Sequence, residues 1–102
     1  MASNSRLELH DKFLKLTKNV YYQPPTGQKM SYPAIVYSRN NIDNIFADDV
    51  VYDQFHSYMA TVIDKDPDSR IVDELSRFPT TRFIRHYTAD GLNHDVFIIY
   101  YK

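Results

Sequence analysis

The C-terminal half of the chain, residues 58–102, constrains the fold more than any other stretch, because its chain-breaking residues fix the order of its elements. Residues 55–64 are rich in Tyr, Thr, Val and Ile, which favours a strand. Asp66-Pro67 predicts a helix with Asp66 as the N-cap and Pro67 at the first helical position, where a missing N–H costs nothing. Phe78-Pro79 then ends this helix.

Two further strands are predicted after that helix, over residues 81–88 and 94–101. The segment between them contains Asp90-Gly91, a pair typical of the two-residue turns that join antiparallel strands. We therefore expect a C-terminal hairpin whose strands pair antiparallel.

The N-terminal part begins with a predicted helix. Leu9, Phe13 and Leu16 recur at intervals of four and three residues and form one apolar stripe. Ser3 or Ser5 is expected to cap the start of this helix.

The middle of the chain is less regular. Residues 20–22 and 32–39 predict two short strands. Residues 40–53 show no clean period, and we expect a long loop or the tip of an extended hairpin there. This segment carries Ile45 and Phe46, which either tuck onto the core or form a surface for a partner, and loops of this length are often functional.

Together these elements predict one α+β domain over residues 1–102, with the order αβββαββ. We expect an antiparallel-rich sheet of four or five strands with both helices packed on one face. A chain of 102 residues is long enough to bury a single core. The nine Tyr and six Phe suit half-buried sheet faces and subunit interfaces, since Tyr joins a large apolar ring to a hydroxyl that needs a partner.

Charge is distributed unevenly along the chain, although the net charge is only −1. Residues 1–42 sum to +4, residues 43–74 to −7 and residues 75–102 to +2. No basic patch strong enough to drive nucleic-acid binding is evident. Blocks of opposite sign allow head-to-tail association between copies, and the alternative is a solvated acidic region.

The sequence offers no group suited to catalysis. Its two glycines, Gly27 and Gly91, are turn residues, so a glycine-rich phosphate loop is excluded. The absence of Cys removes disulfides and thiolate chemistry and fits a reducing compartment. No Ser occurs in the strand–turn–helix context of a hydrolase nucleophile. We therefore expect no enzyme activity, no catalytic residue and no cofactor.

Metal binding is not expected either. The four histidines fall at no metal-ligand spacing, and His86 and His94 are expected to face each other as a cross-strand pair in the terminal hairpin. Asp64-x-Asp66-x-Asp68 resembles the first part of a calcium loop. However, Ser69 replaces the required glycine and Leu75 stands where the bidentate glutamate belongs.

Four short segments carry a resemblance to one viral family. They are Tyr32-Pro33-Ala34-Ile35-Val36-Tyr37, Phe46-Ala47-Asp48-Asp49, Val62-Ile63-Asp64-Lys65-Asp66-Pro67-Asp68-Ser69 and Gly91-Leu92-Asn93-His94-Asp95. With these segments the chain resembles the small tail-completion proteins of long-tailed bacteriophages and, more narrowly, the tail terminator or tail-to-head joining proteins. The resemblance runs from the first predicted helix to the last strand.

This resemblance implies a structural role in a virus particle. Proteins of this family have a sheet flanked by helices, lack catalytic residues and form hexameric rings. The ring caps the head-proximal end of the tail tube, stops its polymerisation and offers a docking surface for the neck, while DNA passes through the lumen only as cargo. We therefore expect a virion protein assembled in the host bacterial cytoplasm, with copies of itself, the major tail tube protein and a head-completion or neck protein as partners, and with no membrane.

Two groups of residues are candidates for contacts in such a ring, because a ring joins one patch of each subunit to a different patch of the next. The acidic segment 43–53 supplies apolar anchors with charged residues on its rim, and arginines further along the chain form a complementary basic group. Of these, Arg82 and Arg85 are expected on opposite faces of one strand. The candidate interface residues are Asp43, Ile45, Phe46, Asp48, Asp49, Arg77, Arg82 and Arg85.

Two alternatives are open on the sequence. Another ring protein of the phage neck, such as a head-closure or connector component, shares the small size and the lack of chemistry. The other alternative is a small metal-dependent or nucleic-acid enzyme built on the histidines.

Overall fold

A computed structural model describes residues 5–101 of the chain. A helix, three strands, a second helix and two further strands follow one another along it. The elements are α1 (Ser5–Leu14), β1 (Val20–Tyr22), β2 (Ala34–Ala47), β3 (Val50–Asp64), α2 (Arg70–Ser76), β4 (Thr81–Ala89) and β5 (Leu92–Tyr101). The predicted α+β class, with one sheet and two helices, is confirmed.

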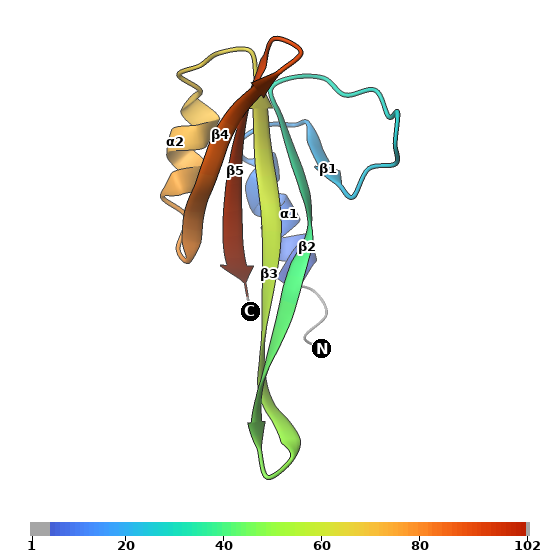
Figure 1. The fold of residues 1–102 in the computed structure, drawn as a ribbon, viewed down its shortest axis with the longest axis vertical. Helices are drawn as coiled ribbons and strands as arrows, with labels where there is room; N and C mark the ends of the chain where they lie inside the picture. The colour runs from blue at the N-terminus through green and yellow to red at the C-terminus, as the bar shows by residue number, and fades with distance from the viewer. Residues whose placement is uncertain (1–4, 102) are drawn as a thin grey trace.

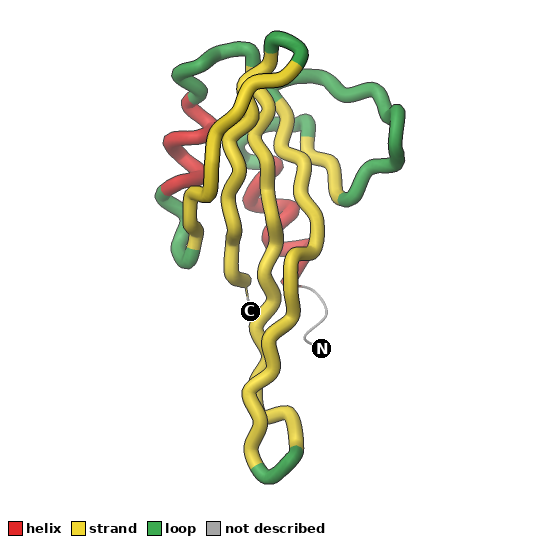
Figure 2. Tube along the Cα trace, in the orientation of Figure 1, coloured by secondary structure: helices red, strands yellow, loops and turns green. Residues whose placement is uncertain are grey.

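The five strands form one mixed sheet in the order β1-β2-β3-β5-β4. The β2–β3 and β4–β5 pairings are antiparallel hairpins, and β3 and β5, which are not consecutive in the chain, also pair antiparallel. The β1–β2 pairing is parallel, and it joins Val20–Tyr22 to Ile35–Tyr37. The loop over residues 23–33 connects β1 to β2 and projects to the side of the sheet (Figures 1 and 2).

The β2–β3 hairpin is longer than predicted. The second strand was expected over residues 32–39 and the third over 55–64, but β2 continues to Ala47 and β3 begins at Val50. Residues 40–53 are therefore not a loop but the far end of an extended hairpin, which was the second of the two expectations. A bulge interrupts the pairing between Arg39 and Asn41 and another between Ile45 and Phe46.

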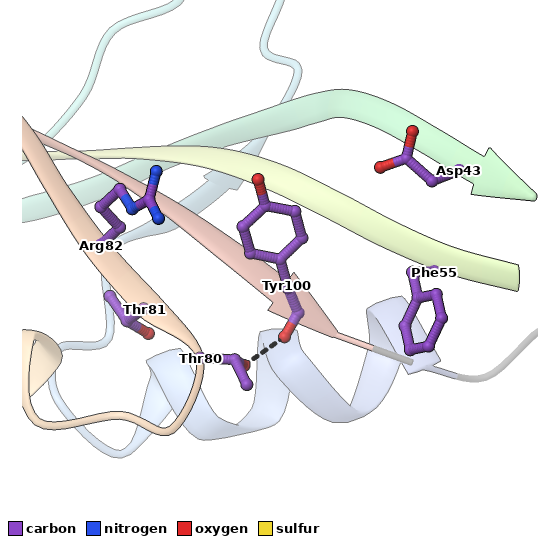
Figure 3. Close-up of a pocket in the computed structure, with 6 residues that line it drawn as sticks. All are labelled: Asp43, Phe55, Thr80, Thr81, Arg82 and Tyr100. Carbon is purple, nitrogen blue, oxygen red and sulfur yellow. Dashed lines mark hydrogen bonds between the residues drawn. The ribbon is translucent and has the colours of Figure 1, made fainter.

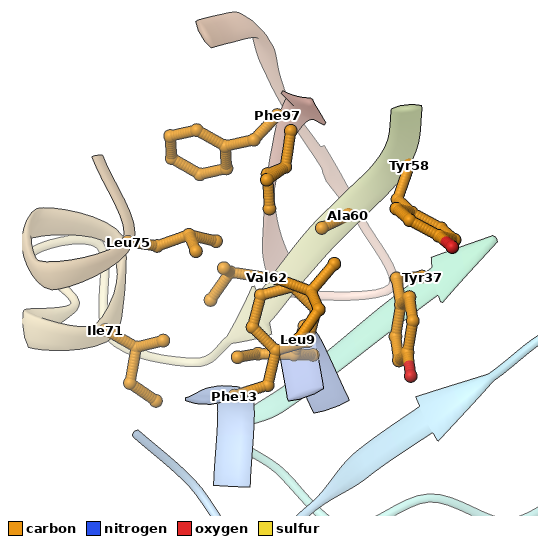
Figure 4. Close-up of a cluster of buried hydrophobic side chains, with 11 residues drawn as sticks. Leu9, Phe13, Tyr37, Tyr58, Ala60, Val62, Ile71, Leu75 and Phe97 are labelled. Atoms are coloured by element: carbon orange, nitrogen blue, oxygen red, sulfur yellow. The ribbon is translucent and has the colours of Figure 1, made fainter. Parts of the chain in front are cut away.

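The core lies between the two helices and one face of the sheet (Figure 4). Strands β2, β3 and β5 turn alternate residues toward it, and their neighbours point to the other face. The ring of Phe13 in α1 meets the ring of Tyr37 edge-on at 5.0 Å and stacks on Phe78 at 6.3 Å. The buried cluster consists of Leu9, Phe13, Ile35, Tyr37, Tyr58, Ala60, Val62, Ile71, Leu75, Phe97 and Ile99.

The first helix follows its predicted stripe. Leu9 and Phe13 are buried, and Leu16 packs against the same cluster although α1 ends at Leu14. The helix begins at Ser5, and the other cap candidate, Ser3, lies outside the described residues.

The second helix begins later than predicted, at Arg70 with Ser69 as its N-cap residue. Asp66 and Pro67 precede it. The Asp64 carboxylate accepts a hydrogen bond from the Asp66 backbone N–H at 3.0 Å, and the Asp66 carboxylate accepts one from the Asp68 N–H at 2.9 Å. The aspartates thus satisfy backbone donors of a loop instead of capping the helix, because Asp side chains stabilise local turns as readily as helix starts.

Candidate interaction site

The β2–β3 hairpin projects beyond the rest of the sheet (Figure 1). β5 pairs with β3 only from His56 to Asp64, so residues 43–55 form a two-stranded ribbon with no third strand among the described ones. We call residues 43–55 the arm. The molecule measures 51 × 24 × 23 Å, and the arm extends it along the long axis (Figure 2).

The arm exposes large apolar side chains. Phe46 is 62% exposed and Val50 is 66% exposed. Phe46 pairs across the ribbon with Val51, while Ala47 pairs with Val50 and shares its face with Ile45. Because consecutive pairs point to opposite sides, both faces of the arm carry apolar surface. Several large apolar side chains exposed close together are typical of interaction sites.

The arm is also acidic, with four Asp and no Lys, Arg or His. Asp48 and Asp49 form its turn, with φ of 53° and 62°. Two-residue turns with positive φ favour Gly at the second position, because a Cβ strains this conformation. The β4–β5 turn follows that preference with Asp90-Gly91, whereas the arm keeps an aspartate in place of the glycine.

A shallow groove of about 540 Å³ opens on the sheet face that the helices leave uncovered (Figure 3). Tyr100 follows the core residue Ile99 on β5, so its ring projects from this uncovered face. The ring stands between Arg82 on one side and Asp43 and Phe55 on the other (Figure 3). The groove is lined by Asp43, Phe55, Thr80, Thr81, Arg82 and Tyr100.

Backbone contacts fix one wall of the groove. The Tyr100 N–H donates to the Thr80 carbonyl at 3.0 Å, and the Thr80 hydroxyl donates to the Tyr100 carbonyl (Figure 3). The start of β4 is thereby held against the end of β5. Hydrogen-bonded strands therefore form this wall of the groove.

Arg82 and Arg85 project from the same face, so the prediction that they lie on opposite faces is wrong. Arg82 pairs with Ile98 and Arg85 pairs with Val96. These β5 residues are two positions apart, and both point to the uncovered face. A bulge between the two arginines inserts one extra residue in β4 and shifts the alternation.

The uncovered face is therefore basic beside its groove. Neither Arg82 nor Arg85 forms an ion pair with a described residue. The guanidinium of Arg85 lies 5.3 Å from the centre of the Tyr87 ring, a cation–π contact along the same strand.

The candidate interface residues lie in three parts of the structure: the groove face, the arm and the helix side. Asp43 and Arg82 stand at opposite ends of the groove, and Arg85 shares its face. Ile45, Phe46, Asp48 and Asp49 lie in the arm. Arg77 is apart from both, since it follows α2 and lines a second depression on the helix side. That depression is formed by Lys12, Lys15, Leu16, Glu74, Arg77, Phe78 and Pro79.

The histidines do not converge. His86 Nδ1 lies 2.9 Å from Asp95 Oδ1, its cross-strand partner, while His94 pairs with Tyr87 and stacks on its ring at 4.6 Å. The two histidines therefore point to opposite faces, and the prediction that they face each other is wrong. Within residues 5–101, as far as they are described, no three His, Asp or Glu side chains are grouped to hold a metal ion.

We call the described residues outside the arm the body. Tyr37 is a buried ionisable residue of the body, at the contact between α1 and the sheet. The Tyr37 hydroxyl is 2.6 Å from His10 Nδ1 and accepts a hydrogen bond from Arg6 Nη1 at 3.3 Å. Burial raises the pKa of Tyr37 above its ordinary value of 10.0, although the nearby Arg6 opposes this shift. This tyrosine holds a helix on the sheet, on the face opposite to the groove.

Several residues of these surfaces escaped the sequence analysis. The sequence pattern places Val50 and Val51 in an irregular segment and gives Phe55 and Tyr100 no role beyond that of strand residues. Two adjacent β-branched valines directly after an acidic turn are a signal for a strand start that a search for clean alternation overlooks.

No helix in the described part of the chain is both long and apolar enough to cross a bilayer. Comparison with known proteins finds no matching family model, no matching curated protein and no matching solved structure.

Proposed function

We propose that this protein is a structural assembly protein of the tail terminator type. Copies of the chain form a hexameric ring that caps the head-proximal end of a phage tail tube, ends polymerisation of the tube and receives the neck of the head. DNA passes through the ring without being gripped. The observation that supports this proposal most is the arm, which carries apolar residues on both faces and has no core of its own to bury them.

The energetics of the arm favour a binding role. A two-stranded ribbon is at best marginally stable in water, and exposed Phe and Val side chains do not stabilise it. Burial against a partner would remove that apolar surface from water, at about 25 cal/mol per Å². An arm that extends away from its own core can reach a neighbouring subunit or the tail tube, as a ring with different patches on its two sides requires.

The four segments that carry the family resemblance are distributed in a way that fits this role. Residues 32–37, 62–69 and 91–95 meet at one end of the sheet, where Ala34 pairs with Ile63 and Ile63 pairs with His94. Residues 46–49 form the tip of the arm at the other end. The resemblance thus covers both ends of the elongated molecule, and in the proposed ring these ends are available to contact the tube and the neck.

The proposal is tested by shortening the arm without disturbing the sheet. Residues 44–54 are replaced by Asn-Gly, which closes a two-residue turn between the paired residues Asp43 and Phe55. Purified tail tube protein is then assembled with each variant, and tube length and capped ends are measured by electron microscopy, with ring mass measured by native mass spectrometry. We expect the intact chain to cap tubes and the shortened chain to leave them growing.

A matched control changes an exposed loop residue outside the arm, the groove and the four resemblance segments, such as Lys29→Ala. This control should cap tubes like the intact chain. Capping of tubes by the shortened chain would show that the arm is not needed for capping. Binding of the intact chain to DNA-filled heads instead of tubes would assign it to the head-closure proteins of the neck.

A further inference from the structure

We propose that the groove on the uncovered sheet face receives the arm tip of a second copy of this chain. This inference deepens the proposed function, on which it rests for the need to self-associate, by naming the surface that the arm occupies. The contact is heterologous: the tip of one subunit lies in the groove of the next, whose own arm extends onward.

Charge complementarity identifies the occupant. The arm tip presents Asp48 and Asp49, and the arm as a whole contains no basic residue. Arg82 at the groove and Arg85 beside it have no carboxylate partner among the described residues. A neighbouring arm supplies the missing partners, and such pairs at the rim of an interface guide association and fix its register.

Charge also gives the docked arm one direction. Asp43 stands at the end of the groove opposite to Arg82 (Figure 3). The tip carboxylates of the incoming arm are repelled by Asp43 and attracted by Arg82, so the turn points toward the β4 side. A single direction is what repeated head-to-tail contacts need if they are to produce one closed ring.

The apolar surfaces are complementary as well. The groove has Phe55 and Tyr100 along its length, and the arm tip offers Phe46 and Val50. Its volume of about 540 Å³ falls within the range of about 300–1,000 Å³ typical of binding sites, so it has room for several side chains. The aromatic residues of the groove are of the kind that dominates binding energy at interfaces.

The chain cannot place the tip of its own arm in this groove, although Asp43 and Phe55 at the base of the arm line it. Thr81 pairs with Ile99 and Ile99 with Tyr58, whereas Val50 lies eight residues further along β3. At about 3.3 Å per residue this separates the tip from Thr81 by about 26 Å along the strand. Only another copy can place a tip there.

The test uses the absence of cysteine from the natural chain. A double variant with Ala47→Cys at the arm tip and Thr81→Cys in the groove is oxidised over a range of protein concentrations. A disulfide needs Cα atoms within about 7 Å, so an intramolecular bond is excluded by the separation above. We expect a ladder of covalent oligomers on denaturing gels, ending at the size of the closed ring.

The control variant combines Ala47→Cys with Asp73→Cys, which is exposed on α2. We expect at least about tenfold less ladder from it, the difference produced by about 1.4 kcal/mol of specific association. A ladder of equal yield in the control, or none in the test variant, would overturn the proposal, and the second result would assign the arm to a different protein such as the tail tube.

A charge reversal in the test variant provides a second readout. Arg82→Glu with Arg85→Glu should reduce the ladder at least about fivefold, and adding Asp48→Lys with Asp49→Lys to the same chain should restore it. The two arginines are exposed, so Arg82→Glu with Arg85→Glu should leave the melting temperature unchanged. An unchanged yield of covalent oligomers after the charge reversal would overturn the role of the arginines.

The two proposals fail in distinguishable ways. A ladder from a protein that does not cap tail tubes would leave the arm-in-groove contact standing and reject the tail terminator role. Capping by a protein that gives no ladder would reject the contact and keep the role.

Discussion

The arm and the body of this protein differ in how far their apolar side chains are buried. In the body, five strands and two helices bury a cluster that includes Leu9, Phe13 and Val62. In the arm, side chains of similar size such as Phe46 and Val50 lie mostly in solvent. The same types of residue therefore stabilise the fold in the body, where they are buried, and do not stabilise it in the arm, where they are exposed.

This difference separates the apolar residues that are needed for folding from those that are not. Burial of the body's apolar residues stabilises the native state directly, so no further role is needed to account for them. The apolar residues of the arm have no such account in the isolated chain. The proposed contact with a second copy would account for them, because it would bury these side chains.

The largest effect is expected from truncating a ring in the body. Phe13→Ala removes contacts with Tyr37 and Phe78 and should lower the free energy of unfolding by about 3–5 kcal/mol. Phe46→Ala in the arm should lower it by less than about 0.5 kcal/mol, because the ring is already exposed. Urea unfolding followed by circular dichroism measures both changes. Equal losses in the two variants would break the distinction between the regions.

A smaller effect tests the contact that holds α1 on the sheet. Tyr37→Phe removes the hydroxyl that contacts His10 and Arg6 and should cost about 1 kcal/mol at neutral pH.

The same substitution changes the dependence of stability on pH. Burial raises the pKa of Tyr37 in the folded state, so its protonated hydroxyl contributes stability that is fully present below the unfolded value near pH 10. That contribution is lost as pH rises through the higher folded-state value. Melting temperatures measured across alkaline pH should fall more steeply for the natural chain than for Tyr37→Phe. Tyr87→Phe on the uncovered face serves as the hydroxyl control, and matching profiles for the natural chain and Tyr37→Phe would contradict the assignment.

The smallest effect compares the two hairpin turns. Asp49→Gly removes the Cβ that is strained at a positive φ in the arm, and it should stabilise the chain by up to about 1 kcal/mol. Gly91→Asp places a Cβ at a positive φ in the β4–β5 turn and should destabilise the chain by a similar amount. Asp49→Gly should also weaken self-association, measured by the yield of the disulfide ladder. A stabilised variant that associates as well as the natural chain would mean that the tip carboxylate has no binding role.

Much of the body could be predicted from the sequence, because its signals are local. The Asp90-Gly91 turn fixed the terminal hairpin, and the spacing of Leu9 and Phe13 fixed the buried side of α1. The start of α2 could not be placed, since Asp66 serves equally well as a helix cap and as a turn acceptor. The choice between these roles depends on the loop around it, which the local sequence does not specify.

The arm and the groove were harder to predict for physical reasons. Alternation of apolar and polar residues arises only where one face of a strand is buried, and nothing in the chain covers the arm. Two bulges further shift the pattern in β2 and β3, and a third in β4 brings Arg82 and Arg85 to one face. The groove joins residues from four strands, so its composition follows from registers that bulges set.

The unpaired strand edges of the arm have a consequence for the protein at high concentration. Exposed backbone donors and acceptors along a ribbon are a template for stacking with identical ribbons, which is how aggregates begin. Two arms meeting tip to tip would double a negative charge that no basic residue in the ribbon offsets. In concentrated solution the carboxylates therefore disfavour the stacking of one arm on an identical arm.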